Sequence, residues 1–422
     1  MRVLRVIGGA VVLASLSASV ANAAWTRPAV LVTGDDAGLL ASVARADGSL
    51  RTAIADTGRD ISLGLVDAAD AAPFADPLVA LRSPARVAYV SLAADGSGVA
   101  LDVQRRAPST VVGFDAAGTT GPLLTVDDVG GGPALAISPT GTAVVAWVAK
   151  SPQGFEVDAA FRDPGSATFG APVRAGYTAD KRTLVSAGIG DSGEAVVAWQ
   201  TNSFPSDLAA AVRLPGAGFS KAGFVSRNAG DVRLAVGPGG QAILASTRGA
   251  GLDVAVKPPG ADTVPAAKRI DRGQGFAVDV AAAGPSAVAA VWLAAPKARD
   301  RARVRVFEGD SRLRRIGTVG RDGYGETVKV AIDGAGATVV AWEEALKAKR
   351  GDPSARSQLG VAYRPAGGRL RAPVHFGPVS LEVTPESVQL GPGGRAWVLY
   401  EAFETSDRDA GYRRVYGTER RP

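Results

Sequence analysis

The side chains on which most enzymes and metal sites depend are nearly missing from this sequence. Its 422 residues include no Cys and a single His, His375. Without Cys there is no thiolate nucleophile, disulfide, iron–sulfur cluster or zinc finger, and one His excludes a multi-histidine metal site. A Ser-His-Asp triad would have to use His375. We expect His375 to be a surface residue on an outer strand, and the sequence indicates no cofactor.

Carboxylates are the remaining candidates for acid–base chemistry. Glu343-Glu344 and Tyr400-Glu401 lie near the ends of two apolar runs. Paired carboxylates about 5 to 10 Å apart suit glycoside hydrolysis. The alternative is that these acids are solvated loop residues, and no residue is assigned a catalytic role.

Aspartates in predicted turns raise the question of calcium, which takes oxygen ligands. These residues are Asp35, Asp36, Asp95, Asp191 and Asp333. No Asp-x-Asp-x-Asp-Gly run is present, so local hydrogen bonding within the turns is the better interpretation. No metal site is predicted.

Two groups of charged residues are candidate ligand contacts. Arg233, Asp279 and Lys329 occupy matching places in three successive units, near one mouth of a predicted central channel. They would line a ligand funnel or neutralise one another as ion pairs between units. The run 297–315 holds eight basic residues, and on a strand Arg301, Arg303 and Arg305 share one face. That face would bind an anionic glycan or a phosphate-rich polymer, or would be a solvated strand whose charges prevent edge-to-edge association.

These residues are positioned by a sequence pattern that recurs about every 50 residues. Ala-Val-Val-Ala-Trp ends at Trp147 and again at Trp199, and Thr-Val-Val-Ala-Trp ends at Trp342. Each Trp follows a turn glycine by six residues. Extending that offset gives eight equivalent positions: 44, 104, 147, 199, 246, 292, 342 and 400. Counted seven residues back from the turn residue of each unit, which is a glycine or, in the sixth unit, Ser286, the matching places are Leu31, Ser91, Ala134, Ser186, Arg233, Asp279, Lys329 and Ser387.

Each unit predicts four short strands. A first strand, such as 328–332, precedes a glycine turn, and the apolar run that ends in Trp forms the second. The third strand ends in a basic residue before a Pro/Gly turn, at Arg162, Arg213, Lys257 and Arg364. Proline near the fourth strand, as at Pro172 and Pro373, fits an outer edge.

Four-stranded units with this period describe the blades of a β-propeller, with a linear solenoid as the rival architecture. The last unit supplies only three strands before the chain ends. A strand near 25–32 would complete it and close the ring by pairing the N- and C-terminal strands. We therefore predict an all-β propeller of seven or eight four-stranded blades over residues 24–422.

The Gly-x5-Trp hairpin resembles the repeats of bacterial secreted β-propeller proteins, including the sialidase-like superfamily. The resemblance covers most of residues 28–418 and concerns the fold. The sialidase Asp-box is not matched, because the turn reads Ser138-Pro-Thr-Gly141 without an Asp. A sialidase-like site uses a Tyr–Glu couple, an acidic Asp and three arginines, and none of these is assigned here.

Residues 1–23 have the pattern of a secretory signal peptide. Arg2 and Arg5 precede a short apolar stretch, and Ala21-Asn22-Ala23 provides the cleavage site. No apolar run is long enough to span a membrane, and a net charge of +6 does not argue for nucleic acid. We expect a secreted monomer that binds a glycan, a cell-wall polymer or a protein without catalysis. The alternative is a carbohydrate-active hydrolase or lyase with acids at the channel mouth.

Overall fold

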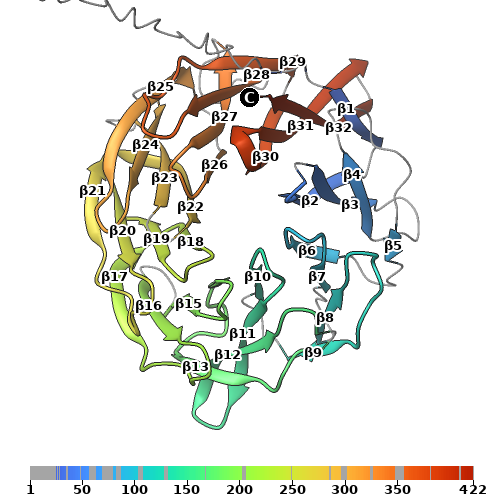
Figure 1. Ribbon diagram of the computed structural model, residues 1–422. Helices are drawn as coiled ribbons and strands as arrows, with labels where there is room; N and C mark the ends of the chain where they lie inside the picture. Colours follow the sequence, from blue (N-terminus) through green and yellow to red (C-terminus); the bar gives the residue numbers. More distant parts are fainter. Residues whose placement is uncertain are drawn as a thin grey trace, which may run out of the picture.

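In the computed structural model the described residues form β-strands and one short 3₁₀ turn, Pro392–Gly394 (Figure 1). The described residues are 25, 27, 29–34, 37–47, 49–56, 63–68, 79–81, 87–102, 108–127, 132–166, 168–201, 206–248, 250–284, 287–295, 302–323, 327–346, 356–380, 382–407 and 410–421. Among them no helix is long and apolar enough to cross a membrane.

The strands form eight antiparallel sheets of four, each hydrogen-bonded internally. The first four sheets are β2 (Ala37–Ala44), β3 (Leu50–Asp56), β4 (Leu63–Ala68) and β5 (Val79–Leu81); β6 (Val87–Leu92), β7 (Gly98–Asp102), β8 (Ser109–Phe114) and β9 (Leu124–Val126); β10 (Ala134–Ile137), β11 (Ala143–Ser151), β12 (Gly154–Arg162) and β13 (Val173–Thr178); β14 (Val185–Ile189), β15 (Ala195–Gln200), β16 (Ser206–Arg213) and β17 (Gly223–Ala229).

The remaining four sheets follow the same order, except that the eighth takes its outermost strand from the start of the chain. They are β18 (Val232–Val236), β19 (Ala242–Thr247), β20 (Gly251–Lys257) and β21 (Lys268–Arg272); β22 (Gln274–Ala283), β23 (Ala287–Ala295), β24 (Ala302–Gly309) and β25 (Arg314–Gly323); β26 (Val328–Ile332), β27 (Thr338–Leu346), β28 (Arg356–Arg364) and β29 (Val374–Ser380); β30 (Glu382–Leu390), β31 (Ala396–Asp407), β32 (Ala410–Arg420) and β1 (Ala29–Gly34).

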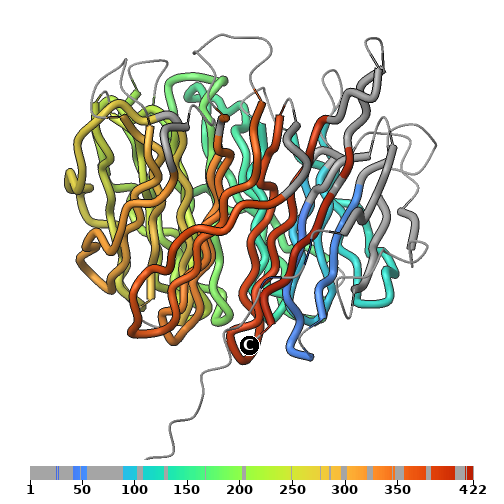
Figure 2. The backbone as a smooth tube through the Cα atoms, turned by 90° about the horizontal axis from the view of Figure 1, so that it is seen from above, coloured from blue at the N-terminus to red at the C-terminus, as the bar shows by residue number. Residues whose placement is uncertain are grey.

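The eight sheets stand around a common centre in a propeller-like arrangement (Figures 1 and 2). The first strand of each sheet is innermost and contacts the first strand of the next, and β30 of the eighth sheet contacts β2 of the first. No described strand pairs with a strand of a neighbouring sheet, so the sheets meet mainly through side chains, with a few backbone hydrogen bonds such as that from the N–H of Asp191 to the carbonyl of Pro238 at 2.9 Å.

The expected N-terminal strand is present and completes the eighth sheet. Strand β1 pairs antiparallel with β32, with Thr33 opposite Arg414. A further bridge joins Trp25 to Arg420. The two ends of the described chain therefore lie side by side in one sheet (Figure 1).

The core lies between sheets, on both faces of the second strands. Trp199 and Trp342 are each 1% exposed, and Tyr400 takes the matching place in the eighth sheet with no exposure. The indole of Trp199 fills the space beside Gly176, on the outer strand of the preceding sheet, where a Cβ atom would clash with it. Burial on both faces explains why these strands are continuously apolar.

In the first two units the predicted register is wrong. Gly38 lies inside β2 and Gly98 begins β7, whereas the hairpin turns fall at 45–49 and 93–97. Ala44 therefore ends an innermost strand instead of occupying a Trp position. Leu31 lies on β1, at the outer edge of the eighth sheet, instead of on an innermost strand.

The basic residues at the ends of the third strands bind the sheets together. Lys257 donates to the turn carbonyl of Gly240 at 3.0 Å and forms a buried ion pair with Glu194 of the preceding sheet. Arg364 donates to the turn carbonyl of Gly336 at 3.0 Å and pairs with Glu308 of the preceding sheet.

The same arrangement recurs at other strand ends, with one exception. Arg162 donates to the carbonyl of Gly141 at 3.2 Å, and Arg420 donates to that of Gly394 at 2.7 Å. The guanidinium of Arg213 instead lies 4.1 Å from the centre of the Phe161 ring on the preceding sheet. These strand-end cations are thus part of the architecture.

Candidate functional site

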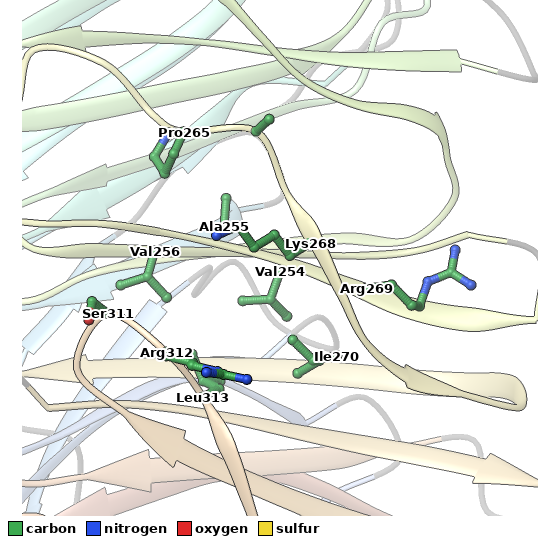
Figure 3. A pocket seen from close by; sticks show the side chains of 11 residues that line it. Val254, Ala255, Val256, Pro265, Lys268, Arg269, Ile270, Ser311, Arg312 and Leu313 are labelled. Atoms are coloured by element: carbon green, nitrogen blue, oxygen red, sulfur yellow. The ribbon is translucent and has the colours of Figure 1, made fainter.

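A cavity of about 640 Å³ opens between the fifth and sixth sheets, beside their outer strands (Figure 3). We call it the rim pocket. It is lined by Val254, Ala255, Val256, Pro265, Ala266, Lys268, Arg269, Ile270, Ser311, Arg312 and Leu313. These residues come from β20, from β21 and the segment before it, and from the turn between β24 and β25.

The floor of the rim pocket is aliphatic. Val254 and Val256 lie two residues apart on β20 and so share one face of the fifth sheet, and Lys268 stands opposite Val254 on β21. Leu313 closes the pocket from the sixth sheet and is 8% exposed. No aromatic, carboxylate or histidine side chain is among the lining residues.

The rim is basic. Lys268, Arg312 and Ser311 are exposed, and no acidic partner of either cation is found among the described residues. Arg269 differs, because its guanidinium pairs with the buried carboxylate of Asp253. Two positive charges therefore face solvent beside an aliphatic floor, an arrangement suited to a ligand with a hydrocarbon part and an anionic part.

The predicted charged trio is brought together on successive innermost strands. Asp279 on β22 accepts a hydrogen bond of 2.9 Å from the backbone N–H of Val330 in the next sheet. Burial raises the pKa of Asp279, and the nearby charges of Lys329 and Arg233 oppose that rise. Arg233 itself pairs with Asp231 at 2.7 Å. Among the described residues no ion pair joins two members of this trio, so both the ion pairs between units and the ligand funnel remain predictions.

The predicted arginine face is only partly described. Arg301 lies outside the described residues, and Arg303 is exposed on β24. Arg305 pairs with Asp271 of the fifth sheet at 2.6 Å and donates to the carbonyl of Arg272 at 2.8 Å. Its guanidinium carbon lies 5.6 Å from the Trp292 ring centre. Arg305 thus joins two sheets, and β24 is the third strand of its sheet instead of the outer one.

The single histidine has a defined partner. Nε2 of His375 lies 2.7 Å from Oε2 of Glu344, and the indole N–H of Trp342 donates to the same oxygen at 3.1 Å. Glu344 is 4% exposed, so the expectation of a solvated loop acid is wrong for this residue. The His375 side chain remains 30% exposed, as an outer-strand residue should.

Glu401 lines a smaller cavity of about 170 Å³ together with Glu382, Thr384, Glu386 and Phe403. Thr384 stands opposite Glu401 in the pairing of β30 with β31. The eighth sheet therefore gathers three glutamates near its innermost strand.

Two of the turn aspartates accept hydrogen bonds from their own turns, and a third accepts from a neighbouring one. Asp95 accepts from the N–H of Ser97 at 2.8 Å, and Asp333 accepts from the N–H groups of Ala335 and Ala337. Asp191 accepts from Thr140 of the preceding sheet, while Asp35 and Asp36 lie outside the described residues. Among the residues described, no group of three or more His, Asp or Glu side chains is arranged to hold a metal ion.

Comparison with known proteins supports the fold class. No protein-family model matches the sequence, and no curated protein does. Among solved structures, the BP39L lectin from Burkholderia pseudomallei superposes with a TM-score of 0.53 at 16% identity, over 81% of this chain and 99% of the lectin. Prolyl oligopeptidase B from Galerina marginata gives 0.50 at 9% identity, over 87% of this chain and 55% of that enzyme. At these identities the likeness shows a β-propeller-type fold.

Sequence reasoning missed most of the rim pocket. Arg312 was part of the noted basic run, but Lys268 and Ile270 carried no signal. Val254 and Val256 were not singled out either, and only the three-dimensional arrangement brings them beside Leu313 at a cavity.

Proposed function

We propose that the protein is a secreted, non-catalytic β-propeller that serves as a binding scaffold for a polymer or protein ligand. In this proposal residues 1–23 are a signal peptide, and the eight sheets are the blades of one closed, monomeric ring. The pairing of β1 with β32 and the contact of β30 with β2 support the closure. We also propose, from the Gly-x5-Trp hairpins, that the protein is related to the sialidase-like superfamily.

The rim pocket is the observation that carries the binding function. It combines a concave aliphatic floor with exposed cations that have no acidic partner among the residues described. None of its lining side chains is a carboxylate or a histidine, so a ligand there meets groups that hold it and no acid–base pair. Arg233, Asp279, Lys329, Arg303 and Arg305 remain a second set of proposed contacts.

Binding to immobilised extracellular glycans, cell-wall polymers and protein extracts tests the proposal. The wild-type chain should retain at least one ligand, and Ile270→Trp, which places an indole into the pocket, should lose it. Lys181→Ala, which removes an exposed cation in the turn between β13 and β14, is the matched control. Melting temperatures of both variants establish folding. If Ile270→Trp binds the ligand as well as the wild-type chain does, the rim pocket is not the binding site.

A carbohydrate-active enzyme is the alternative, and the cavity lined by Glu382, Glu386 and Glu401 favours it. Glu401 stands opposite Thr384 and so diagonal to Glu382, a placement that allows two carboxylates about 5 to 10 Å apart, as glycoside hydrolysis requires. A panel of chromogenic glycosides tests this alternative. Turnover that Glu401→Gln abolishes would establish it, whereas no turnover by the folded wild-type chain would exclude it for those substrates.

A further inference from the structure

The basic rim continues beyond the rim pocket. Arg312 stands in the turn before β25, and Arg314 and Arg315 begin that strand; all three are exposed. Together with Lys268 they form what we call the basic row. In the described part of the chain, none of the four pairs with an acidic side chain.

The nearby acids are committed elsewhere. Asp253 pairs with Arg269, and Glu308 pairs with Arg364 and accepts from Thr338. Asp310 accepts from the hydroxyl of Ser311 at 3.2 Å. Among these acids only Asp310 has no cationic partner in the described part of the chain, so the four cations of the basic row keep a net positive charge.

The floor of the rim pocket narrows the class of ligand. Val254, Ile270 and Leu313 offer hydrocarbon and no hydrogen-bonding groups, so sugar hydroxyls placed on them would lose their water partners. An aliphatic side chain placed there gains burial instead. An anionic polysaccharide could pair with the cations of the basic row but would place hydroxyl groups on the aliphatic floor. A fatty acid could bury its hydrocarbon chain on the floor but has only one negative charge for the four cations.

The neighbouring strand suits an extended partner. Strand β21 is the outermost strand of the fifth sheet, so its outer side has no strand partner within that sheet. Peptides commonly bind beside such edges, with pockets that accept alternate side chains. Lys268 and Ile270 both line the pocket from β21, where a register irregularity between Arg269 and Asp271 leaves Ile270 without a directly opposite residue on β20.

From these observations we infer that the rim pocket and the basic row bind an extended acidic peptide segment. One aliphatic side chain of the peptide would lie on Val254, Ile270 and Leu313, and flanking carboxylates would meet Lys268, Arg312 and the arginines that follow. This inference rests on the proposed binding function and assigns its ligand class.

Fluorescence anisotropy with a labelled peptide, Gly-Asp-Glu-Leu-Asp-Leu-Glu-Gly, tests the inference. Lys268→Ala/Arg312→Ala should weaken binding at least tenfold. Lys181→Ala/Arg182→Ala removes two exposed cations elsewhere and should change the affinity less than twofold. Replacing both peptide leucines by serine, with the charges kept, should also weaken binding at least tenfold. Melting curves establish that both double variants fold.

Three results would overturn the inference. Equal losses in the two double variants would indicate non-specific attraction, and equal binding of the serine peptide would show that the floor is unused. Tighter binding of dextran sulfate or dodecanoate at the same site would assign another class. If the peptide does not bind, but a ligand from the binding array binds and loses affinity in Lys268→Ala/Arg312→Ala, the peptide inference is wrong and the proposed scaffold function is retained. If neither binds, both proposals fail.

Discussion

Single buried charges hold neighbouring sheets at a fixed distance. Lys257 is fully buried, and its ammonium group lies between Glu194 and the carbonyls of Gly240 and Pro258. Glu194 also accepts from the N–H of Gly260 at 3.1 Å. An ion pair in this setting stabilises only while both partners are present, because either charge alone would be buried without compensation.

Lys257→Ala should therefore lower the free energy of unfolding by about 3–5 kcal/mol, since it leaves Glu194 buried and unpaired. Lys257→Met/Glu194→Leu should recover much of that loss. Urea denaturation measures both effects. Arg174→Ala, at an exposed pair with Glu156, is the control and should cost about 1 kcal/mol or less. A small loss in Lys257→Ala would mean that Glu194 reaches water.

Asp158 gives a pH dependence of stability. Burial and the neighbouring Glu156 raise its pKa to about 6. The folded state thus keeps this proton up to about pH 6, whereas the unfolded chain releases it near pH 4. Between those values the unfolded state binds fewer protons, so this residue makes stability fall as pH rises, and the deficit persists at higher pH.

Asp158→Asn should stabilise the fold at pH 8 by about 1 kcal/mol, after allowance for the partial exposure of the side chain, and should change little at pH 4. Thermal melts at the two pH values measure the difference. Glu156→Gln removes the neighbouring charge and should reduce the pH dependence. An Asn variant that is equally destabilised at both values would contradict the assignment.

At the scale of the hairpin, the indole of Trp342 occupies space that is available only because the neighbouring strand has a glycine, Gly360, opposite it. Trp342 on β27 stands opposite Gly360 on β28, and a Cβ atom at Gly360 would clash with the indole ring. The glycine is thus required by the tryptophan and not by its backbone conformation. Sequence alone marked the tryptophan, but not the reason for its partner.

Trp342→Ala should cost about 3–5 kcal/mol through lost core volume, and Gly360→Ala about 1–3 kcal/mol through overpacking. In the double variant the added methyl group enters the vacated space, so the cost of Gly360→Ala should largely disappear. Urea denaturation of the wild type, the two single variants and the double variant measures the free energies of unfolding for this double-mutant cycle. Additive losses would show that the two side chains do not share one space.

Prediction from sequence succeeded where the hairpin retained its tryptophan. The strand 328–332 is observed as β26, and the expected N-terminal strand pairs with β32. It failed at β2 and β3, where no aromatic residue marks the second strand and two neighbouring runs are equally small and apolar. The rim pocket was inaccessible to such reasoning, because its walls belong to different sheets.

At the scale of the whole molecule, the pairing of β1 with β32 joins the beginning of the chain to its end. The absence of native cysteine makes this testable with one engineered disulfide. Thr33 and Arg414 stand directly opposite each other, and antiparallel partners have Cα separations that a disulfide spans.

The variant Thr33→Cys/Arg414→Cys should form the cross-link under mild oxidation. Because it closes a loop of nearly the whole chain, it should stabilise the fold by up to about 5 kcal/mol relative to its reduced form. Non-reducing electrophoresis and paired thermal melts measure both effects. Single-cysteine variants are the controls, and failure to cross-link would contradict the observed pairing.

The bridge between Trp25 and Arg420 has a consequence for how this chain can be rearranged. Since the first and last described strands are already neighbours, a short linker would join them without moving either. New ends opened between the fourth and fifth sheets, near the exposed Asp231, would then give a circular permutant that keeps all eight sheets. In this permutant the four strands of the eighth sheet would follow one another along the chain. Such a permutant would present its termini on the opposite side of the ring, free for fusion or surface attachment.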